Sequence, residues 1–189
     1  SPPSPLPSPP PLPSLPPIPP PPFVLATITD AVGYHPRSDL PLSNFYDRDY
    51  TTLGFSGGNR GLSGGAWVSL YLGGTTRVKQ VDVFNRDDSY GSLLGSFTVW
   101  VSDAPGSDTI AYDPSTATQC GGLVTSSASL GPFSAVCDDV ILGSYVTVKQ
   151  ETTSKGWLAI AEVEVYRSAE PPSPPSPPLP AGAPSPPPP

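Results

Sequence analysis

Several residue types are rare or missing in this chain of 189 residues. It has no methionine, one histidine and two cysteines, and only 13% of its residues are charged. No apolar run is long enough to span a membrane, and a net charge of −7 without a basic patch argues against nucleic-acid binding. Without methionine, we expect a processed piece of a longer protein. One histidine, no phosphate-binding loop and no nucleophile motif predict a protein that is not an enzyme.

Proline is the residue that the chain has in excess. Of 31 prolines, 14 lie in residues 1–22 and 12 in residues 171–189, which leaves five for the middle. Proline fixes φ and removes a backbone donor, so these stretches can form neither helix nor sheet, and polyproline II remains. We therefore expect a polyproline II arm over 1–22, a folded domain over 23–168 and a second polyproline II arm over 169–189. At about 3.1 Å per residue, the first arm would reach roughly 65–70 Å.

The two arms allow three interpretations. They are disordered linkers, ligands for a proline-binding groove, or rods of a wall-type glycoprotein with hydroxylated and O-glycosylated prolines. The repetition of Ser-Pro-Pro at both ends favours the third interpretation. The candidate positions for O-glycosylated hydroxyproline are Pro2, Pro3, Pro5, Pro9, Pro10, Pro171, Pro172, Pro174, Pro175, Pro177 and Pro178.

The middle of the chain reads as short strands separated by glycine and proline turns. None of its segments has a convincing helical period, and a glycine-rich turn is expected at 73–76. Short strands without helices indicate an all-β fold, an antiparallel sandwich or barrel. The expected strands are 23–29, 66–72, 77–84, 96–102, 144–150 and 156–167.

The run 156–167 is expected to close the folded domain, since proline-rich sequence follows it. Strict alternation places Val163 and Val165 on one face and Leu158 and Ile160 on the other. A run that is apolar on both faces is typical of a central strand rather than a solvated edge.

An early loop offers oxygen ligands for a hard cation. Residues 43–50 bring Asn44, Asp47 and Asp49 within six positions of one another, although without the fixed spacing of an EF-hand. A solvated turn with Asx caps explains the same residues, and both interpretations stay open. Glu162, in the last expected strand, either stands at a sheet face or edge or reaches a cation held by this loop.

The two cysteines, Cys120 and Cys137, also allow two interpretations. One disulfide would indicate an oxidising compartment, whereas two buried free thiols are the alternative. The chain contains no Asn-x-Ser/Thr sequence, so N-glycosylation is not expected.

The order of the strands resembles the galactose-binding-like, discoidin-type jelly roll, and within it the F-type (fucose-binding) lectin branch. The resemblance covers 23–168 and implies an antiparallel jelly-roll β-sandwich of about eight strands. Cys120 and Cys137 stand where that branch has a disulfide between adjacent segments. The segments that carry the resemblance are 67–72, 81–88, 143–148 and 161–166.

The resemblance implies a sugar site that this chain matches in part. The lectin branch holds fucose with a His, an Arg that begins an Arg-x-Asp turn, vicinal cysteines and a second Arg. Arg86 and Asp88 match Arg-x-Asp, but Ser89 and Tyr90 stand in place of the cysteines and Leu93 in place of the second Arg. Because Tyr90 offers a face for stacking, the candidate carbohydrate-binding residues are Arg86, Asp88 and Tyr90. The same resemblance implies a structural calcium ion held by Asn44, Asp47, Asp49 and Glu162.

The proline-rich arms resemble the hydroxyproline-rich glycoproteins of green-algal cell walls and flagellar surfaces. We therefore predict a structural module of an extracellular glycoprotein in a cell wall, a matrix or a flagellar surface fibre. Its rods would be glycosylated spacers, and its sandwich an interaction bead. The alternative is a lectin domain with a degenerate fucose-type site around Arg86. The expected partners are other glycoprotein rods or surface glycans, and self-association stays open.

Overall fold

The computed structural model describes residues 23–57, 65–107, 112–151 and 157–169. The candidate hydroxyprolines lie outside these residues. The described part is all-β, with two short 3-10 helices. Its elements are β1 (Phe23–Leu25), β2 (Asp30–Gly33), η1 (Leu42–Phe45), β3 (Gly54–Gly57), β4 (Trp67–Asn85), η2 (Gly91–Leu93), β5 (Ser96–Ser102), β6 (Thr118–Gln119), β7 (Val124–Thr125), β8 (Phe133–Gln150) and β9 (Trp157–Ser168).

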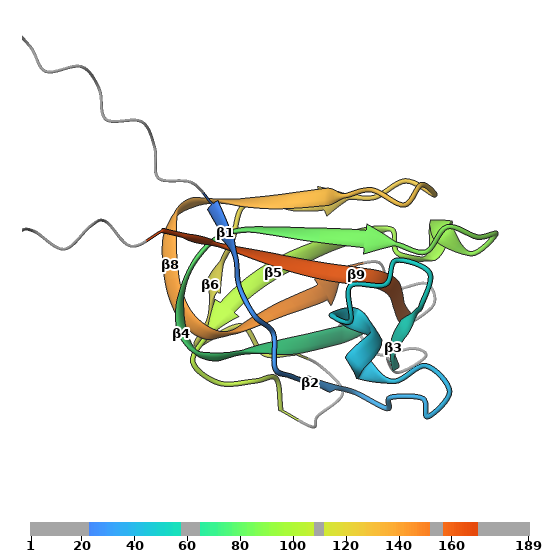
Figure 1. Cartoon of the computed structure of the whole chain (residues 1–189), viewed down its shortest axis with the longest axis horizontal. Helices are drawn as coiled ribbons and strands as arrows, with labels where there is room; N and C mark the ends of the chain where they lie inside the picture. The colour runs from blue at the N-terminus through green and yellow to red at the C-terminus, as the bar shows by residue number, and fades with distance from the viewer. Residues whose placement is uncertain (1–22, 58–64, 108–111, 152–156, 170–189) are drawn as a thin grey trace, which may run out of the picture.

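The strands form an antiparallel jelly-roll sandwich, which confirms the expected fold class. The neighbour order is β1-β9-β4-β8-β5-β6, with β2 on β4, β3 on β9 and β7 on β5. Figure 1 shows the long strands β4 and β8 bending at one end of the molecule and running back, so that each contributes to both layers. Among the described residues, no helix is long and apolar enough to cross a membrane.

The prediction of a glycine-rich turn between two strands at 73–76 is wrong. β4 runs through it, and its pairing with β8 resumes beyond a register shift between Tyr71 and Thr76. Gly73 and Gly74 have φ values of 73° and 150°, which residues with a side chain rarely adopt. Because the ladder continues on both sides, these glycines bend one long strand over the sandwich instead of ending it.

A β-bulge in β9 corrects the alternation expected for the last strand. Phe84 faces Glu162, but the next residue of β4, Asn85, faces Ile160, so β9 carries one extra residue there. The extra residue reverses the parity of the strand. Leu158 and Val163 therefore both lie in the hydrophobic core, rather than on opposite faces. β9 lies between β1 and β4, as expected of a central strand.

The core fills the space between the two layers. Its largest fully buried apolar side chains include Phe45, Phe97, Leu70 and Leu158. The disulfide between Cys120 and Cys137 adds a covalent link between the end of β6 and β8, which confirms the pairing that the resemblance implied. Both cysteines are buried.

The two ends of the sandwich carry different parts of the chain. Phe23 pairs with Ser168, so both proline-rich arms join the domain at one end. Trp157, at the beginning of the 12-residue strand β9, lies roughly 35 Å away at about 3.3 Å per residue. Figure 1 shows η1, β3 and the beginning of β9 gathered at this far end. The loops at the far end build the candidate site.

Candidate functional site

An open pocket lies at the end of the sandwich where β4 ends and β9 begins. It encloses about 270 Å³. Its lining comes from the loop after β2, from β3, from the turn after β4 and from β9, so distant parts of the sequence meet there. The residues that matter for its chemistry are Arg37, Phe55, Arg86, Tyr90, Leu93 and Trp157.

Arg86 is held in place from two sides. Its Nε donates to Oδ1 of Asp88 at 2.6 Å and its Nη2 to Oδ2 at 2.5 Å, which makes a bidentate fork. Its guanidinium carbon lies 5.0 Å from the ring centroid of Tyr90, so the cation stacks on the ring. The hydrogen bonds from the Arg86 guanidinium lower the pKa of Asp88. The three sugar-site candidates from the sequence therefore form one unit.

The buried residue Asn85 fixes the turn that carries Arg86. Its Nδ2 donates to the carbonyl oxygens of Gly91 and Ser127 at 2.7 and 2.9 Å. Its Oδ1 accepts from the backbone N–H of Arg86 at 2.9 Å. Only 15% of the Arg86 side chain is exposed. This arginine is therefore positioned by buried structure before any ligand arrives.

A second arginine, which the sequence reasoning missed, enters the same pocket. Arg37 donates from Nε to Oδ1 of Asp39 at 2.9 Å and from Nη2 to Oδ2 at 2.5 Å. Its guanidinium lies 5.4 Å from the ring centroid of Phe55. Arg37-Ser-Asp39 is an Arg-x-Asp sequence, as is Arg86-Asp-Asp88. That repetition was the signal that could have found it.

Aromatic rings form one side of the pocket. Phe55 of β3 and Trp157 of β9 lie with their ring centroids 6.4 Å apart, because β3 pairs with the beginning of β9. The ring of Tyr90 stands at the mouth, where this residue is 57% exposed. Arginine donors and flat apolar rings around one hollow suit a ligand with an apolar face and several hydroxyl groups.

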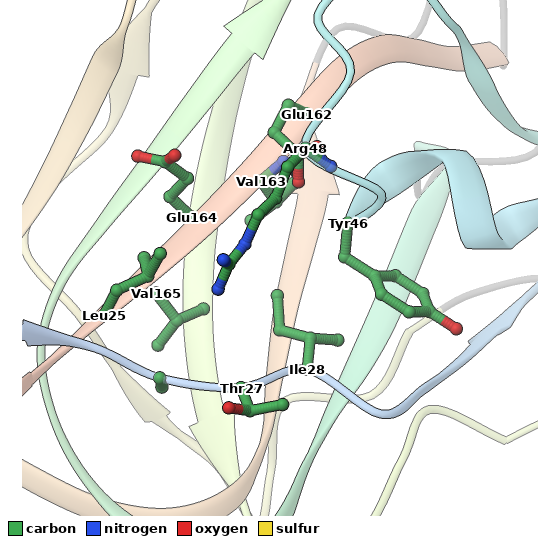
Figure 2. A pocket seen from close by; sticks show the side chains of 10 residues that line it. Leu25, Thr27, Ile28, Tyr46, Arg48, Glu162, Val163, Glu164 and Val165 are labelled. Atoms are coloured by element: carbon green, nitrogen blue, oxygen red, sulfur yellow. Dashed lines mark hydrogen bonds between the residues drawn. The ribbon is translucent and has the colours of Figure 1, made fainter.

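The candidate metal ligands divide into two groups. Glu162 is buried, and its Oε2 accepts from the backbone N–H of Arg48 at 2.6 Å. Arg48 has a φ of 63°, an uncommon value for a residue with a side chain, so the loop is held in a tight turn against the carboxylate. Figure 2 shows Arg48 and Glu162 side by side. Both residues line a cleft of about 200 Å³. The β9 bulge directs Glu162 toward this loop.

The remaining candidates are engaged within the loop. Asp47 accepts from the N–H of Asp49 and from the Thr52 hydroxyl, at 2.9 and 2.8 Å. Asp49 accepts from Thr51. Asn44 donates to the carbonyl of Leu53. The Asx-capped turn foreseen as one interpretation is thus present. Within the described ranges, no group of three or more carboxylate, histidine or cysteine side chains is arranged for a metal ion.

The buried carboxyl of Glu162 lies in surroundings that disfavour its negative charge. Burial raises its pKa to about 7, and the negative charge of Asp47 adds to that rise. A cation beside both carboxylates would offset the cost of burying the charge. The negative charge of Asp47 acts on Glu162, whereas Oδ1 of Asp49 accepts from Thr51.

The fold places this geometry among known proteins. No protein family known from sequence matches the chain, and no curated protein does either. Solved structures are similar. The family 32 carbohydrate-binding module of C. perfringens NanJ, in complex with galactose, has a TM-score of 0.59 at 15% identity, over 76% of this chain and 100% of that chain. The chain has a galactose-binding-like jelly-roll fold.

Two further structures belong to the same comparison. The fucolectin from striped bass serum has a TM-score of 0.59 at 19% identity, over 78% of this chain and 50% of that chain. A truncated AlyQ with CBM32 and alginate lyase domains has a TM-score of 0.57 at 17% identity, over 79% of this chain. The chain spans only 34% of that two-domain protein.

Proposed function

We propose that this protein is an extracellular glycan-binding module that holds a sugar in the pocket of Arg37 and Arg86. One observation carries the proposal. Two Arg-x-Asp forks, each stacked on an aromatic ring, line one hollow. Structural neighbours support it, because the NanJ module is in complex with galactose and a lectin domain of lectinolysin with Lewis B antigen. Convergent fixed donors beside aromatic faces are what sugar recognition needs.

The position of the arms agrees with such a role. Both arms join the end of the sandwich opposite to the pocket, so a ligand meets the pocket without passing the attachment point. The disulfide supports an oxidising, extracellular location. We propose that the proline-rich arms are glycosylated spacers of a hydroxyproline-rich glycoprotein in a cell wall, a matrix or a flagellar surface.

A structural bead is the second candidate function. The chain lacks the histidine and the second arginine of the fucose-type pattern at their expected positions, and two proline-rich arms flank the domain. In this alternative, the sandwich contacts neighbouring rods or further copies of itself, and the pocket holds no free sugar. The two candidates differ in one property that can be measured, the affinity for soluble glycans.

We also propose a structural calcium ion at Glu162 and Asp47. Its role would be to join the 46–49 loop to β9, the strand that begins at Trp157. Asn44 and Asp49 belong to the same loop. Their hydrogen bonds to Leu53 and Thr51 use Nδ2 of Asn44 and Oδ1 of Asp49, so Oδ1 of Asn44 and Oδ2 of Asp49 would be the further ligand atoms.

Isothermal titration calorimetry of the full chain with galactose and with fucose tests the proposed function. We expect binding that Arg86→Ala and Arg37→Ala each weaken by tenfold or more, because each change removes fixed donors. Arg77→Ala is the matched control, since Arg77 is exposed on β4 outside this pocket. Absence of binding to both sugars, or equal loss in all three variants, would leave the structural bead as the better account.

A further inference from the structure

We infer that the sugar site continues past Arg86 into a second pocket, so that the module recognises a neutral oligosaccharide of at least two sugar units rather than a single sugar. The inference rests on the proposed function and specifies its ligand. The second pocket encloses about 400 Å³ and is lined by Tyr50, Thr51, Leu53, Arg86, Asp87 and Leu130, together with Asp88.

Arg86 joins the two pockets. Among the described residues, Arg86 alone lines both hollows, whereas Arg37, Phe55 and Trp157 line the first and Tyr50 the second. Its fork to Asp88 uses Nε and Nη2. A guanidinium has five N–H groups, so donors remain for neighbouring hydroxyls. One fixed arginine can thus contact two linked sugar units.

Tyr50 gives the second pocket a ring of its own. The residue is 40% exposed, and its ring packs on Phe84 with the centroids 4.7 Å apart. Its hydroxyl donates to Oε1 of Glu164 at 2.8 Å. That bond raises the pKa of Tyr50 to about 12. The ring is therefore fixed on one edge by packing and on the other by a hydrogen bond, which leaves a rigid surface for a second sugar.

The charges of the combined groove favour a neutral ligand. Each arginine is already paired with its own aspartate, Arg37 with Asp39 and Arg86 with Asp88. Asp87 also lines the second pocket and, among the described residues, forms no salt bridge. An acidic or sulfated sugar would meet the negative charge of Asp87 without a free cation to pair with among the described lining residues. Vicinal hydroxyls, in contrast, can donate to the carboxylates and accept from the guanidinium groups.

The test compares sugars of different length on the full chain. The probes are two matched pairs, galactose with β-1,4-linked galactotriose and fucose with the Lewis b oligosaccharide. We expect at least one oligosaccharide to bind about tenfold more tightly than its monosaccharide, the gain from one further sugar on an aromatic surface. Tyr50→Ala should remove this gain and leave monosaccharide affinity unchanged. Tyr50→Phe, which keeps the ring and loses the bond to Glu164, should retain it.

The possible outcomes test the second pocket separately from the proposed sugar site at Arg37 and Arg86. Equal affinities for monosaccharide and oligosaccharide, or a gain that survives in Tyr50→Ala, would overturn the second pocket while the sugar site at Arg37 and Arg86 stands. Absence of binding to all four probes would overturn both. Monosaccharide binding in Tyr50→Ala also reports that this variant is folded.

Discussion

Glu162 allows a quantitative prediction about stability and pH. Its pKa lies at about 7 instead of the usual 4.5, chiefly because the carboxyl is buried. The folded state therefore holds this proton more tightly than the unfolded state does. The stabilisation is complete below pH 4.5 and is lost as the pH rises through 7. At about 1.4 kcal/mol per pH unit between the two values, the loss reaches up to about 3 kcal/mol.

The assay is urea-induced unfolding of the full chain at pH 5 and pH 8 in the presence of a chelator. Between these pH values, we expect the free energy of unfolding to fall by about 2–3 kcal/mol more in the wild type than in Glu162→Gln. This corresponds to about 1.4 kcal/mol for each pH unit of the interval in which the carboxyl titrates. The glutamine cannot ionise, and it can still accept one of the bonds now made by Arg48 and Val163. The comparison of slopes removes any constant cost of the substitution. Equal slopes in the two proteins would refute the reasoning from burial.

Calcium supplies a second arm of the same experiment. At calcium concentrations about 100 times the dissociation constant, binding adds about 2.7 kcal/mol to the stability of the folded state. At pH 8 we expect this gain in the wild type and a much smaller one in Glu162→Gln. An unchanged denaturation midpoint in the wild type at millimolar calcium would exclude the proposed calcium ion.

Three further predictions concern the framework. Replacing Cys120 and Cys137 by alanine should cost about 3 kcal/mol in chemical denaturation, from the entropy of a loop closed at a separation of 17 residues; no change would mean that the link does not constrain the unfolded chain. Leu158→Ala should cost 2–5 kcal/mol, since the β9 bulge turns Leu158 into the core; a cost below 1 kcal/mol would place it outside. Gly54→Ala should lower the melting temperature markedly, because its Cβ would lie 2.6 Å from the Phe45 ring, and an unchanged value would show that the ring moves aside.

Much of the fold followed from local pattern, and the errors share one cause. Alternation and turn residues predict strands, but they carry no information on an irregularity in the ladder. The bulge near Ala161 and the bend at Gly73 are settled by pairing with β4 and β8, which are distant in sequence. Each inserted residue reverses the faces of a strand, so Leu158 was placed on the wrong side.

The site was predicted in part for a similar reason. Arg86, Asp88 and Tyr90 are close in sequence, so one motif found them together. Trp157 meets Phe55 in the pocket because β3 pairs with β9, a contact between residues about 100 positions apart. Arg37 comes to the same pocket from the loop after β2. The repeated Arg-x-Asp pattern was visible in the sequence, but only the three-dimensional arrangement gives it a meaning. The prediction of hydroxylated and glycosylated arms stays a prediction.

The most direct test of the central claim is an NMR titration of the full chain with galactose and fucose, followed through the three tryptophan indole signals. Trp157 lines the pocket, whereas Trp67 is fully buried and does not line it. We expect the indole signal of Trp157 and the backbone signals of Arg86 and Tyr90 to shift with one common affinity, while the Trp67 indole signal stays in place. Shifts confined to other parts of the sandwich, or none with either sugar at saturating concentration, would contradict this expectation.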